Sequence, residues 1–270
     1  MIYQYLKPSQ ILSPFIKHFW ILEENNPSGE VCIPRMYPTG FTELVFYYGD
    51  RYLHIDKNKS KTPQPYSYFM GQNNSYYDIS PTGKIGVIAI TFKPDTAKLF
   101  FKTPIDEAEN SFIALEDIIG KFTRNLEYEL QIAKSNIDRI HLIEKFLINQ
   151  LKKNYSEDHK RIGFSVDKIN QSKGLISIVE LADFACLSTK QFNRKFTEFV
   201  GIKPKQFTRV VRFQNTIYSQ QRRSVKNLTE LAYKCGYYDQ AHFTNEFKEF
   251  TGYSPKEFFK TCEPYSDYFS

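Results

Sequence analysis

The feature that most constrains this fold is a pattern written twice near the end of the chain. Both copies open with a Leu-Ala pair, Leu181-Ala182 and Leu231-Ala232. Phenylalanines, a glycine and a proline then follow in the same order: Phe192, Phe196, Phe199, Gly201, Pro204 and Phe207, and again Phe243, Phe247, Phe250, Gly252, Pro255 and Phe258. The offset is 51 residues from the first phenylalanine onward and 50 at the Leu-Ala pair. Such a repeat indicates one supersecondary unit used twice.

Each copy is predicted to form two short helices joined by a turn. Ser177 and Ser188 can cap the two helices of the first copy, the second of which runs towards Gly201. Asp239 can cap the second helix of the second copy, which ends near Gly252. The pattern therefore predicts two helix-turn-helix units.

The second helix of each unit is apolar on one face, because its phenylalanines are spaced i, i+4 and i+7. The other face is polar, with Lys190, Asn193, Arg194 and Thr197 in the first unit and Gln240, Ala241, Thr244, Asn245 and Lys248 in the second. Arginine can pair with guanine, and asparagine or glutamine with adenine. A helix of this kind suits the DNA major groove, and the alternative is a small helical domain with a solvated face.

Residues 163–260 resemble the DNA-binding domain of the AraC/XylS family of bacterial transcription regulators. The resemblance lies in Leu228-Thr229-Glu230-Leu231-Ala232, Cys235-Gly236-Tyr237, Asp239, His242-Phe243, Phe247-Lys248, Thr251-Gly252-Tyr253-Ser254-Pro255 and Phe258. The first copy is more divergent. The resemblance implies two helix-turn-helix units joined by a long helix, here Pro204–Gln221. Their recognition helices would enter successive major grooves about 34 Å apart.

Site roles follow from residue type and position. The base-facing candidates are Lys190, Asn193, Arg194, Gln240, Thr244 and Asn245, with Thr197 and Ala241 on the same faces. The phosphate candidates are Ser188, Lys205, Arg209, Lys248 and Lys256, for which a solvated basic face is the alternative. We expect His242 to pack or to meet a phosphate. We expect the repeated phenylalanines to be core, which argues against single-strand binding by stacking.

The positive charge of the chain is concentrated in the region that contains the repeat. Residues 163–262 hold 16 Lys/Arg and 9 Asp/Glu, a net charge of +7, whereas the whole chain carries +6. A basic excess confined to one domain is typical of nucleic-acid binding.

The first 120 residues read instead as short strands, in a chain whose length favours two domains. The predicted strands are Phe15–Leu22, Glu30–Pro34, Thr42–Tyr48, Tyr52–Ile55, Tyr66–Gly71, Tyr76–Ile79 and Gly86–Phe92, with a loop at Lys57–Pro65. Short helices are predicted at Pro94–Phe101 and Ile113–Ile119. The fold class is therefore α+β, a small β-barrel or sandwich with following helices and then an all-α domain.

Residues 1–120 also resemble the cupin-like sensor domains that many members of this family carry, through Pro38, Gly40, Glu43-Leu44, Phe69, Gly71 and the strand Gly86–Pro94. The resemblance implies a small-molecule effector, whose identity stays unknown. No His-x-His pair is present, so we expect no metal and no cofactor. Aromatic side chains could line an apolar pocket or serve as ordinary core: Trp20, Tyr37, Phe41, Phe46, Tyr47, Tyr48, Tyr66, Tyr68, Tyr76 and Tyr77. Arg35 could hold an anionic ligand or pair with a carboxylate.

Residues 121–153 are predicted to form one or two helices with an apolar face of Ile137, Ile140, Leu147, Ile148 and Leu151. This face either packs on the first domain or forms the seam of a homodimer. Residues 154–162 are polar and are predicted to be an interdomain linker. A helix at Phe164–Ser172 then opens the DNA-binding domain, residues 163–262.

The four cysteines, Cys32, Cys186, Cys235 and Cys262, form no metal-binding or disulfide pattern, and Cys186 and Cys235 are expected to be buried. No signal peptide or membrane-spanning run is visible, so we expect a cytoplasmic, nucleoid-associated protein.

The leading hypothesis is an effector-controlled transcription regulator that binds double-stranded DNA, with RNA polymerase as a further partner. The alternatives are an N-terminal domain that only oligomerises or docks a protein, and an enzyme with a DNA-binding tail. We do not expect an enzyme.

Overall fold

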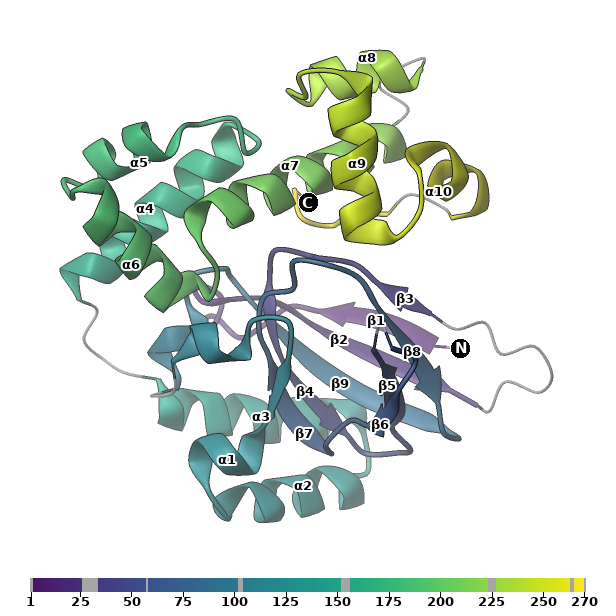
Figure 1. The fold of residues 1–270 in the computed structure, drawn as a ribbon. Helices are drawn as coiled ribbons and strands as arrows, with labels where there is room; N and C mark the ends of the chain where they lie inside the picture. Colours follow the sequence, from purple (N-terminus) through teal and green to yellow (C-terminus); the bar gives the residue numbers. More distant parts are fainter. Residues whose placement is uncertain are drawn as a thin grey trace.

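The computed structural model describes residues 2–25, 34–56, 58–101, 104–151, 156–222, 227–262 and 265–269. A β-rich N-terminal part carries an all-helical C-terminal part at one end of its sheets (Figure 1). The α+β class and the order of its two parts are therefore as predicted. None of the helices in the described ranges is both long and apolar enough to cross a bilayer.

Two antiparallel sheets form the N-terminal part. The larger has the strand order β1-β2-β9-β4-β7-β10, with β1 (Ile2–Leu6), β2 (Ile16–Glu24), β4 (Thr42–Tyr47), β7 (Ser67–Met70), β9 (Ile85–Phe92) and β10 (Phe112–Ala114). The smaller has the order β3-β8-β5-β6, with β3 (Arg35–Met36), β5 (Tyr52–Ile55), β6 (Lys61–Pro63) and β8 (Tyr77–Pro81).

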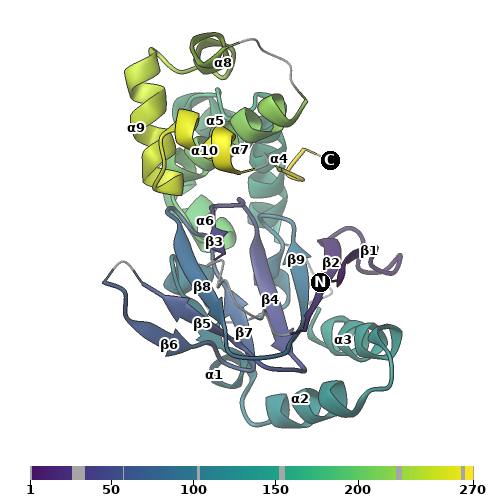
Figure 2. The same cartoon turned by 90° about the vertical axis from the view of Figure 1, so that its right-hand side faces the viewer.

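Strand β4 shows why the larger sheet is apolar on both faces. Its side chains alternate across the sheet. Val45 and Tyr47 belong to the core between the two sheets. Leu44 and Phe46 face a second core, beneath helices α1 (Leu115–Ile119), α2 (Phe122–Ile132) and α3 (Asn136–Gln150). Figure 2 shows α2 and α3 at the end of the molecule that lies away from the C-terminal helices.

The apolar face predicted for residues 121–153 is divided in the structure. Ile140, Leu147 and Leu151 pack on the core of the N-terminal part. Ile137 and Ile148 are exposed, at 63% and 38%. Packing on the first domain is therefore confirmed for one side of α3, and the dimer seam stays a prediction for the other.

Six of the predicted strands are confirmed as β2, β4, β5, β7, β8 and β9. The predicted strand at Glu30–Pro34 lies almost wholly outside the described residues. The loop prediction for Lys57–Pro65 was wrong in part, because β6 forms there by pairing with β5. The predicted helix at Pro94–Phe101 is only a 3₁₀ turn, η1 (Ala97–Leu99), and a second turn, η2 (Ile105–Ala108), follows it.

The C-terminal part consists of α4 (Glu157–Gln171), α5 (Ile178–Phe184), α6 (Thr189–Val200), α7 (Pro204–Gln221), α8 (Leu228–Lys234), α9 (Gln240–Thr251) and α10 (Pro255–Thr261). The linker prediction was wrong for residues 157–162, which are the first turns of α4. The Ser156 side chain accepts a hydrogen bond from the amide of His159, so a cap starts this helix inside a stretch that looked aperiodic.

The repeat folds as predicted. Ser177, Ser188 and Asp239 cap α5, α6 and α9. Gly201 and Gly252 end α6 and α9 in the left-handed conformation.

One position differs between the two copies in a way that matters physically. The turn of the second unit places Gly236 at a φ of 75°, and the equivalent residue in the first unit is Cys186, at a φ of 52°. A side chain with a Cβ is strained in this region, whereas glycine is not. Cys186 is exposed and Cys235 is buried, so the prediction of burial was right for Cys235 alone.

We expect Cys186→Gly to raise the free energy of unfolding by about 1 kcal/mol, because it removes the Cβ that disfavours a positive φ. Urea denaturation of the full chain would measure the change. Cys186→Ala is the matched control, since it removes the thiol and keeps the Cβ. An equal gain in the alanine variant would contradict the strain argument.

Candidate nucleic-acid interface

Helix α6 presents a polar face because its aromatic side chains lie underneath it. Phe192 and Phe196 are fully buried, and Phe199 is 7% exposed. They pack with α4, α5 and α7 in one apolar core. On the opposite side Lys190 and Arg194 are exposed, four residues apart, and so lie on one face.

Helix α9 repeats this construction. Phe243, Phe247 and Phe250 are fully buried in a separate core with α7, α8 and α10. Ala241, Asn245 and Lys248 are exposed on the other side of the helix. The repeated phenylalanines are therefore core residues, as predicted.

Helix α7 joins the two units, with α6 at one end and α9 beside its other half (Figure 1). Eleven of its 18 residues are buried. Both recognition helices run with their C-terminal ends towards the N-terminal part, and their N-terminal ends lie away from it (Figure 1). DNA-reading helices of helix-turn-helix proteins contact bases mainly through their N-terminal residues.

Several side chains on the two faces already have local partners. The Asn193 amide donates to the carbonyl of Thr189 (2.7 Å), and the Thr244 hydroxyl donates to the carbonyl of Gln240 (2.8 Å). The Gln240 side chain accepts from the hydroxyl of Thr229 on α8 (3.0 Å). Thr197 is half-buried, and the exposed Ser188 is engaged in the capping box of α6. His242 packs against the ring of Tyr237, as expected.

Two sets of cations on and around α6 and α9 differ in their surroundings. The first set is exposed and, in the described ranges, has no carboxylate within 4.0 Å: Lys190, Arg194, Lys205, Lys248 and Lys256. The second set is paired with carboxylates: Lys195 with Asp158 (2.9 Å), and Arg209 and Arg212 with Glu246. Arginine or lysine side chains without an acidic partner are the groups that can neutralise phosphates.

Arg209 belongs to the paired set, so its guanidinium is already engaged by carboxylates, and its role as a phosphate contact stays a prediction. Its guanidinium donates to Glu246 (2.8 Å) and to Glu249 (2.5 Å) on α9. Arg212, one turn along α7, donates to both oxygens of Glu246 at 2.8 Å. These hydrogen bonds tie α9 to α7.

Glu246 is 4% exposed and is the centre of this network. Burial opposes its ionised form, but the hydrogen bonds from Arg209 and Arg212 outweigh burial, so the pKa of Glu246 lies below its usual value. We missed this residue in the sequence. The available signal was a carboxylate directly before Phe247, on the face that the apolar stripe marks as buried.

Both recognition helices end on the N-terminal part. The Cα of Gly201, after α6, lies against η2, where a Cβ would meet the side chain of Ile105 at 3.0 Å. After α9, a Cβ on Gly252 would meet a guanidinium nitrogen of Arg35 at 2.6 Å. The N-terminal part thus contacts the same point of the repeat in both units.

Arg35 is the polar element of this contact. It forms a bidentate pair with Asp78 (2.7 and 3.0 Å) and lies over the rings of Tyr76 and Tyr253. Its third nitrogen, Nη1, donates to the carbonyl of Thr251 at the end of α9 (3.2 Å). Of the two predicted alternatives, pairing with a carboxylate is the one observed.

Residues 265–269 lie between the two parts. The ring of Tyr268 stacks on Phe41 of the N-terminal part (4.9 Å), and its hydroxyl donates to Asn170 of α4 (2.8 Å). Ser266 donates to Gln214 of α7 (2.6 Å), which in turn donates to the carbonyl of Pro38. This segment adds a third attachment, which the sequence did not predict.

The aromatic side chains of the N-terminal part do not gather in one place. Tyr47 and Tyr68 are buried between the sheets with Trp20 and Tyr77, and Phe46 faces the helices. The others lie at the domain contact, on the surface or beside an outer pocket: Tyr37, Phe41, Tyr48, Tyr66 and Tyr76. Across the described ranges, no group of three or more His, Cys, Asp or Glu side chains could hold a metal ion.

Comparison with known proteins separates the two parts. Residues 181–261 match a family described as a helix-turn-helix domain, and residues 4–114 match a domain of unknown function (DUF6597). An uncharacterized HTH-type transcriptional regulator of Haemophilus influenzae is 31% identical over 84 residues, which cover 31% of this chain and 28% of that protein. The match thus spans less than a third of the relative's length.

Several solved structures are similar to most of the chain. ToxT of Vibrio cholerae O395 is 12% identical, with a TM-score of 0.44 over 96% of this chain and 97% of that one. The AraC-like transcriptional activator CuxR is also 12% identical, with a TM-score of 0.26 over 77% of this chain and 84% of that one.

We expect Glu246→Gln to lower the free energy of unfolding by about 3 kcal/mol at neutral pH, because it removes the carboxylate shared by two partly buried arginines and leaves Arg212 without its anion, while Arg209 keeps only Glu249. The folded pKa of Glu246 is lowered, so its contribution is complete above the unfolded value of about 4.3 and is lost as the pH falls below it. Denaturation of both proteins between pH 7 and pH 3 should therefore show the difference shrinking in acid. A difference that stays constant with pH would contradict the ionic role.

Proposed function

We propose that this chain, whose C-terminal domain belongs to the AraC type of helix-turn-helix domain, is a transcription regulator that binds double-stranded DNA in a sequence-specific manner. The observation that carries the proposal is the division of its cations. Lys190, Arg194, Lys205, Lys248 and Lys256 are exposed and have no acidic partner within the described chain, whereas Lys195, Arg209 and Arg212 are paired with carboxylates. A face kept basic in this way suits a polyanion.

In the proposed complex α6 and α9 lie in successive major grooves on one side of the duplex. Lys190, Asn193 and Arg194 read bases in the first groove, and Gln240, Thr244 and Asn245 in the second. Ser188, Lys205, Lys248 and Lys256 hold phosphates. Thr197 and Ala241 line the same faces. Asn193, Gln240 and Thr244 must exchange their present hydrogen bonds for bonds to bases. Arg194 and Asn245 are therefore the side chains that can contact bases with the least rearrangement.

The N-terminal domain is proposed to control DNA binding through a small-molecule effector. Support comes from its contacts with both recognition helices, because a change in these contacts can alter how the two helices are held. A second candidate is a domain that only oligomerises or docks a partner. Exposed apolar side chains on α2 and α3 favour a homodimer through this end: Phe122, Tyr128, Ile132 and Ile137.

Action on chromosomal DNA places the proposed regulator in the cytoplasm, with the nucleoid, and makes RNA polymerase a candidate partner. No catalytic role is part of the proposal. Selection of binding sites from a random duplex library with the full chain tests it directly. We expect two half-sites whose centres lie about 10–10.5 base pairs apart. Recovery of unenriched sequence at low salt would reject sequence-specific binding.

We expect Arg194→Ala to cost about 1–3 kcal/mol on the selected duplex and to relax preference in one half-site only. Lys205→Ala should instead weaken selected and random duplexes alike and reduce the salt slope by about 1. Both are measured by fluorescence anisotropy at several salt concentrations, with Lys61→Ala on β6 as the control. Equal weakening by Arg194→Ala on both duplexes would show that it contacts phosphate.

We expect Arg35→Ala to weaken binding to the two-half-site duplex by roughly three- to tenfold, because α9 loses its attachment and must be ordered on binding. Affinity for a duplex that keeps only the α6 half-site should not change. Arg51→Ala is the matched control, since Arg51 also lies over a tyrosine ring but within the N-terminal domain. The same loss on both duplexes would argue for a general loss of stability.

A further inference from the structure

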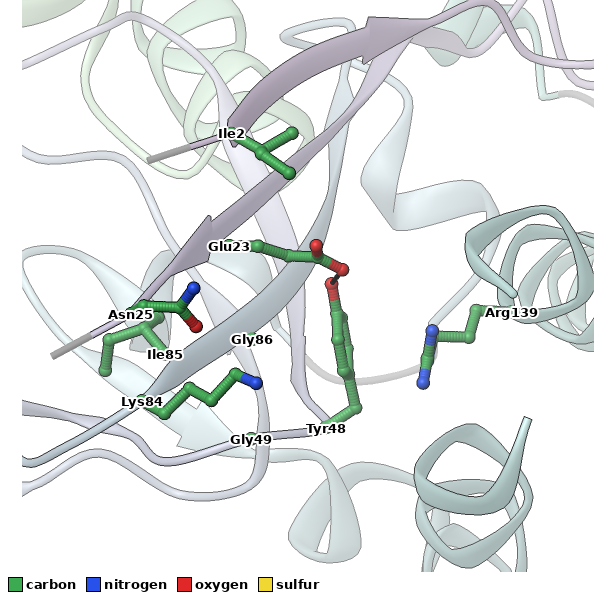
Figure 3. Close-up of a pocket in the computed structure, with 9 residues that line it drawn as sticks. All are labelled: Ile2, Glu23, Asn25, Tyr48, Gly49, Lys84, Ile85, Gly86 and Arg139. Atoms are coloured by element: carbon green, nitrogen blue, oxygen red, sulfur yellow. Dashed lines mark hydrogen bonds between the residues drawn. The ribbon is translucent and has the colours of Figure 1, made fainter. Parts of the chain in front are cut away.

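A pocket of about 450 Å³ opens on the outer side of the N-terminal domain (Figure 3). It lies where the end of β2, the start of β9 and helix α3 meet. The side chains that give it chemical character are Glu23, Asn25, Tyr48, Lys84 and Arg139. Its size is that of a small-molecule site.

Glu23 is held in place by its neighbours. One carboxylate oxygen accepts hydrogen bonds from the hydroxyl of Tyr48 (2.9 Å) and the amide of Asn136 on α3 (3.0 Å). These two bonds are also the main reason why the pKa of Glu23 is lowered, so the group is an anion at neutral pH. Within the described chain its second oxygen, Oε2, makes no hydrogen bond.

Arg139 forms a fixed positive wall. Its guanidinium lies over the ring of Tyr48 at 3.9 Å. Its three nitrogens donate to the carbonyls of Leu130 and Ala133 and to the side chain of Asn136. The helix α3 and the connection before it therefore hold this cation still.

Lys84 supplies the pocket with an ammonium group that has no acidic partner in the described part of the chain. Its backbone is fixed, because its amide donates to Asp50 (2.7 Å). Its side chain is exposed and extends into the space between Asn25 and Tyr48 (Figure 3). In the part of the chain that the structure describes, no carboxylate lies within 4.0 Å of its ammonium group.

Glu23, Lys84 and Arg139 line the same pocket, so its wall carries both signs of charge and excludes the simplest ligands. A plain anion would meet the carboxylate of Glu23, and a plain cation would meet Lys84 and Arg139. A molecule that carries both charges satisfies both sides at once. Ile2 and Ile85 add an apolar wall for the rest of such a ligand.

We infer that this pocket binds a small zwitterion of the amino-acid type, with its ammonium group on Oε2 of Glu23 and its carboxylate on Lys84. As a binding site the inference stands on these contacts alone. As the site of the effector it rests on the proposed function. The ligand would then join β2 to the turn before β9, and Glu23 accepts in turn from Asn136 of α3, the helix that precedes α4 in the chain.

The test uses the full chain without DNA. The twenty common L-amino acids are screened by thermal shift, and the best binder is titrated by calorimetry beside its amine-only and carboxylate-only analogues. We expect saturable binding of an aliphatic amino acid and at least about tenfold weaker binding of both analogues, because each lacks one charge-assisted contact.

Variants then locate the site. Lys84→Ala and Glu23→Gln should each weaken binding at least about tenfold, and Lys61→Ala, an exposed lysine on β6, should not. Lys84 is exposed, so its variant tests the site without disturbing the core. Binding that survives Lys84→Ala, an analogue that binds as well as its parent, or a silent screen would overturn the inference.

The two proposals fail separately. Sequence-specific DNA binding without any amino-acid binding would reject the pocket and keep the regulator. Amino-acid binding without DNA binding would keep the pocket and reject the regulator. Binding of both that leaves DNA affinity unchanged would reject the pocket as the effector site.

Discussion

The burial of α7 between the two helix-turn-helix units is the constraint on which the C-terminal domain depends. One part of this helix packs on Phe196 of α6 through Phe207, and another packs on Phe247 and Phe250 of α9 through Phe213. Apolar packing of this kind fixes distance but allows rotation and sliding. The hydrogen bonds from Arg209 and Arg212 to Glu246 fix the orientation of α9 relative to α7, because a bidentate pair is satisfied in one orientation only. A buried charge network therefore sets the angle of α9, at some cost in desolvation.

The same network explains how the domain keeps its outward face basic. Glu246 and Glu249 are close to the recognition surface along the chain, and each is neutralised from behind by arginines of α7. Lys195 is neutralised in turn by Asp158 of α4. The acidic groups thus pair with cations that cannot reach the outward face, and Lys190 and Arg194 keep their charge for it. Net charge alone, a modest +6 for the chain, does not reveal this arrangement.

Helices α5, α6 and α9 were predictable to within a residue or two, because their signals are local. Caps, the phenylalanine spacing and the closing glycines each act within a few residues, whereas α7 was expected only from the family resemblance. The role of Arg209 was not predictable, since a basic residue on a helix looks the same whether its partner is a phosphate or a carboxylate 40 residues away in sequence. The start of α4 was missed for the opposite reason: a single serine cap at Ser156 outweighs a polar composition. The segment 265–269 depends on distant partners, which no local pattern records. Strand β6 pairs with the nearby β5, but its polar, proline-containing sequence is typical of a loop.

The contacts between the two domains differ in chemical type. This difference decides which contact is most affected by a small displacement of the N-terminal domain. At α6 the contact is apolar, with Ile105 against Gly201, and at residues 265–269 it is largely an aromatic stack. Contacts of this kind tolerate displacements of a few tenths of an ångström. At α9 a single guanidinium joins Asp78, two rings and the carbonyl of Thr251. Hydrogen bonds weaken steeply with distance and angle, and the bond to Thr251 is already 3.2 Å long. A small shift of the N-terminal domain therefore changes the position of α9 before it changes the position of α6.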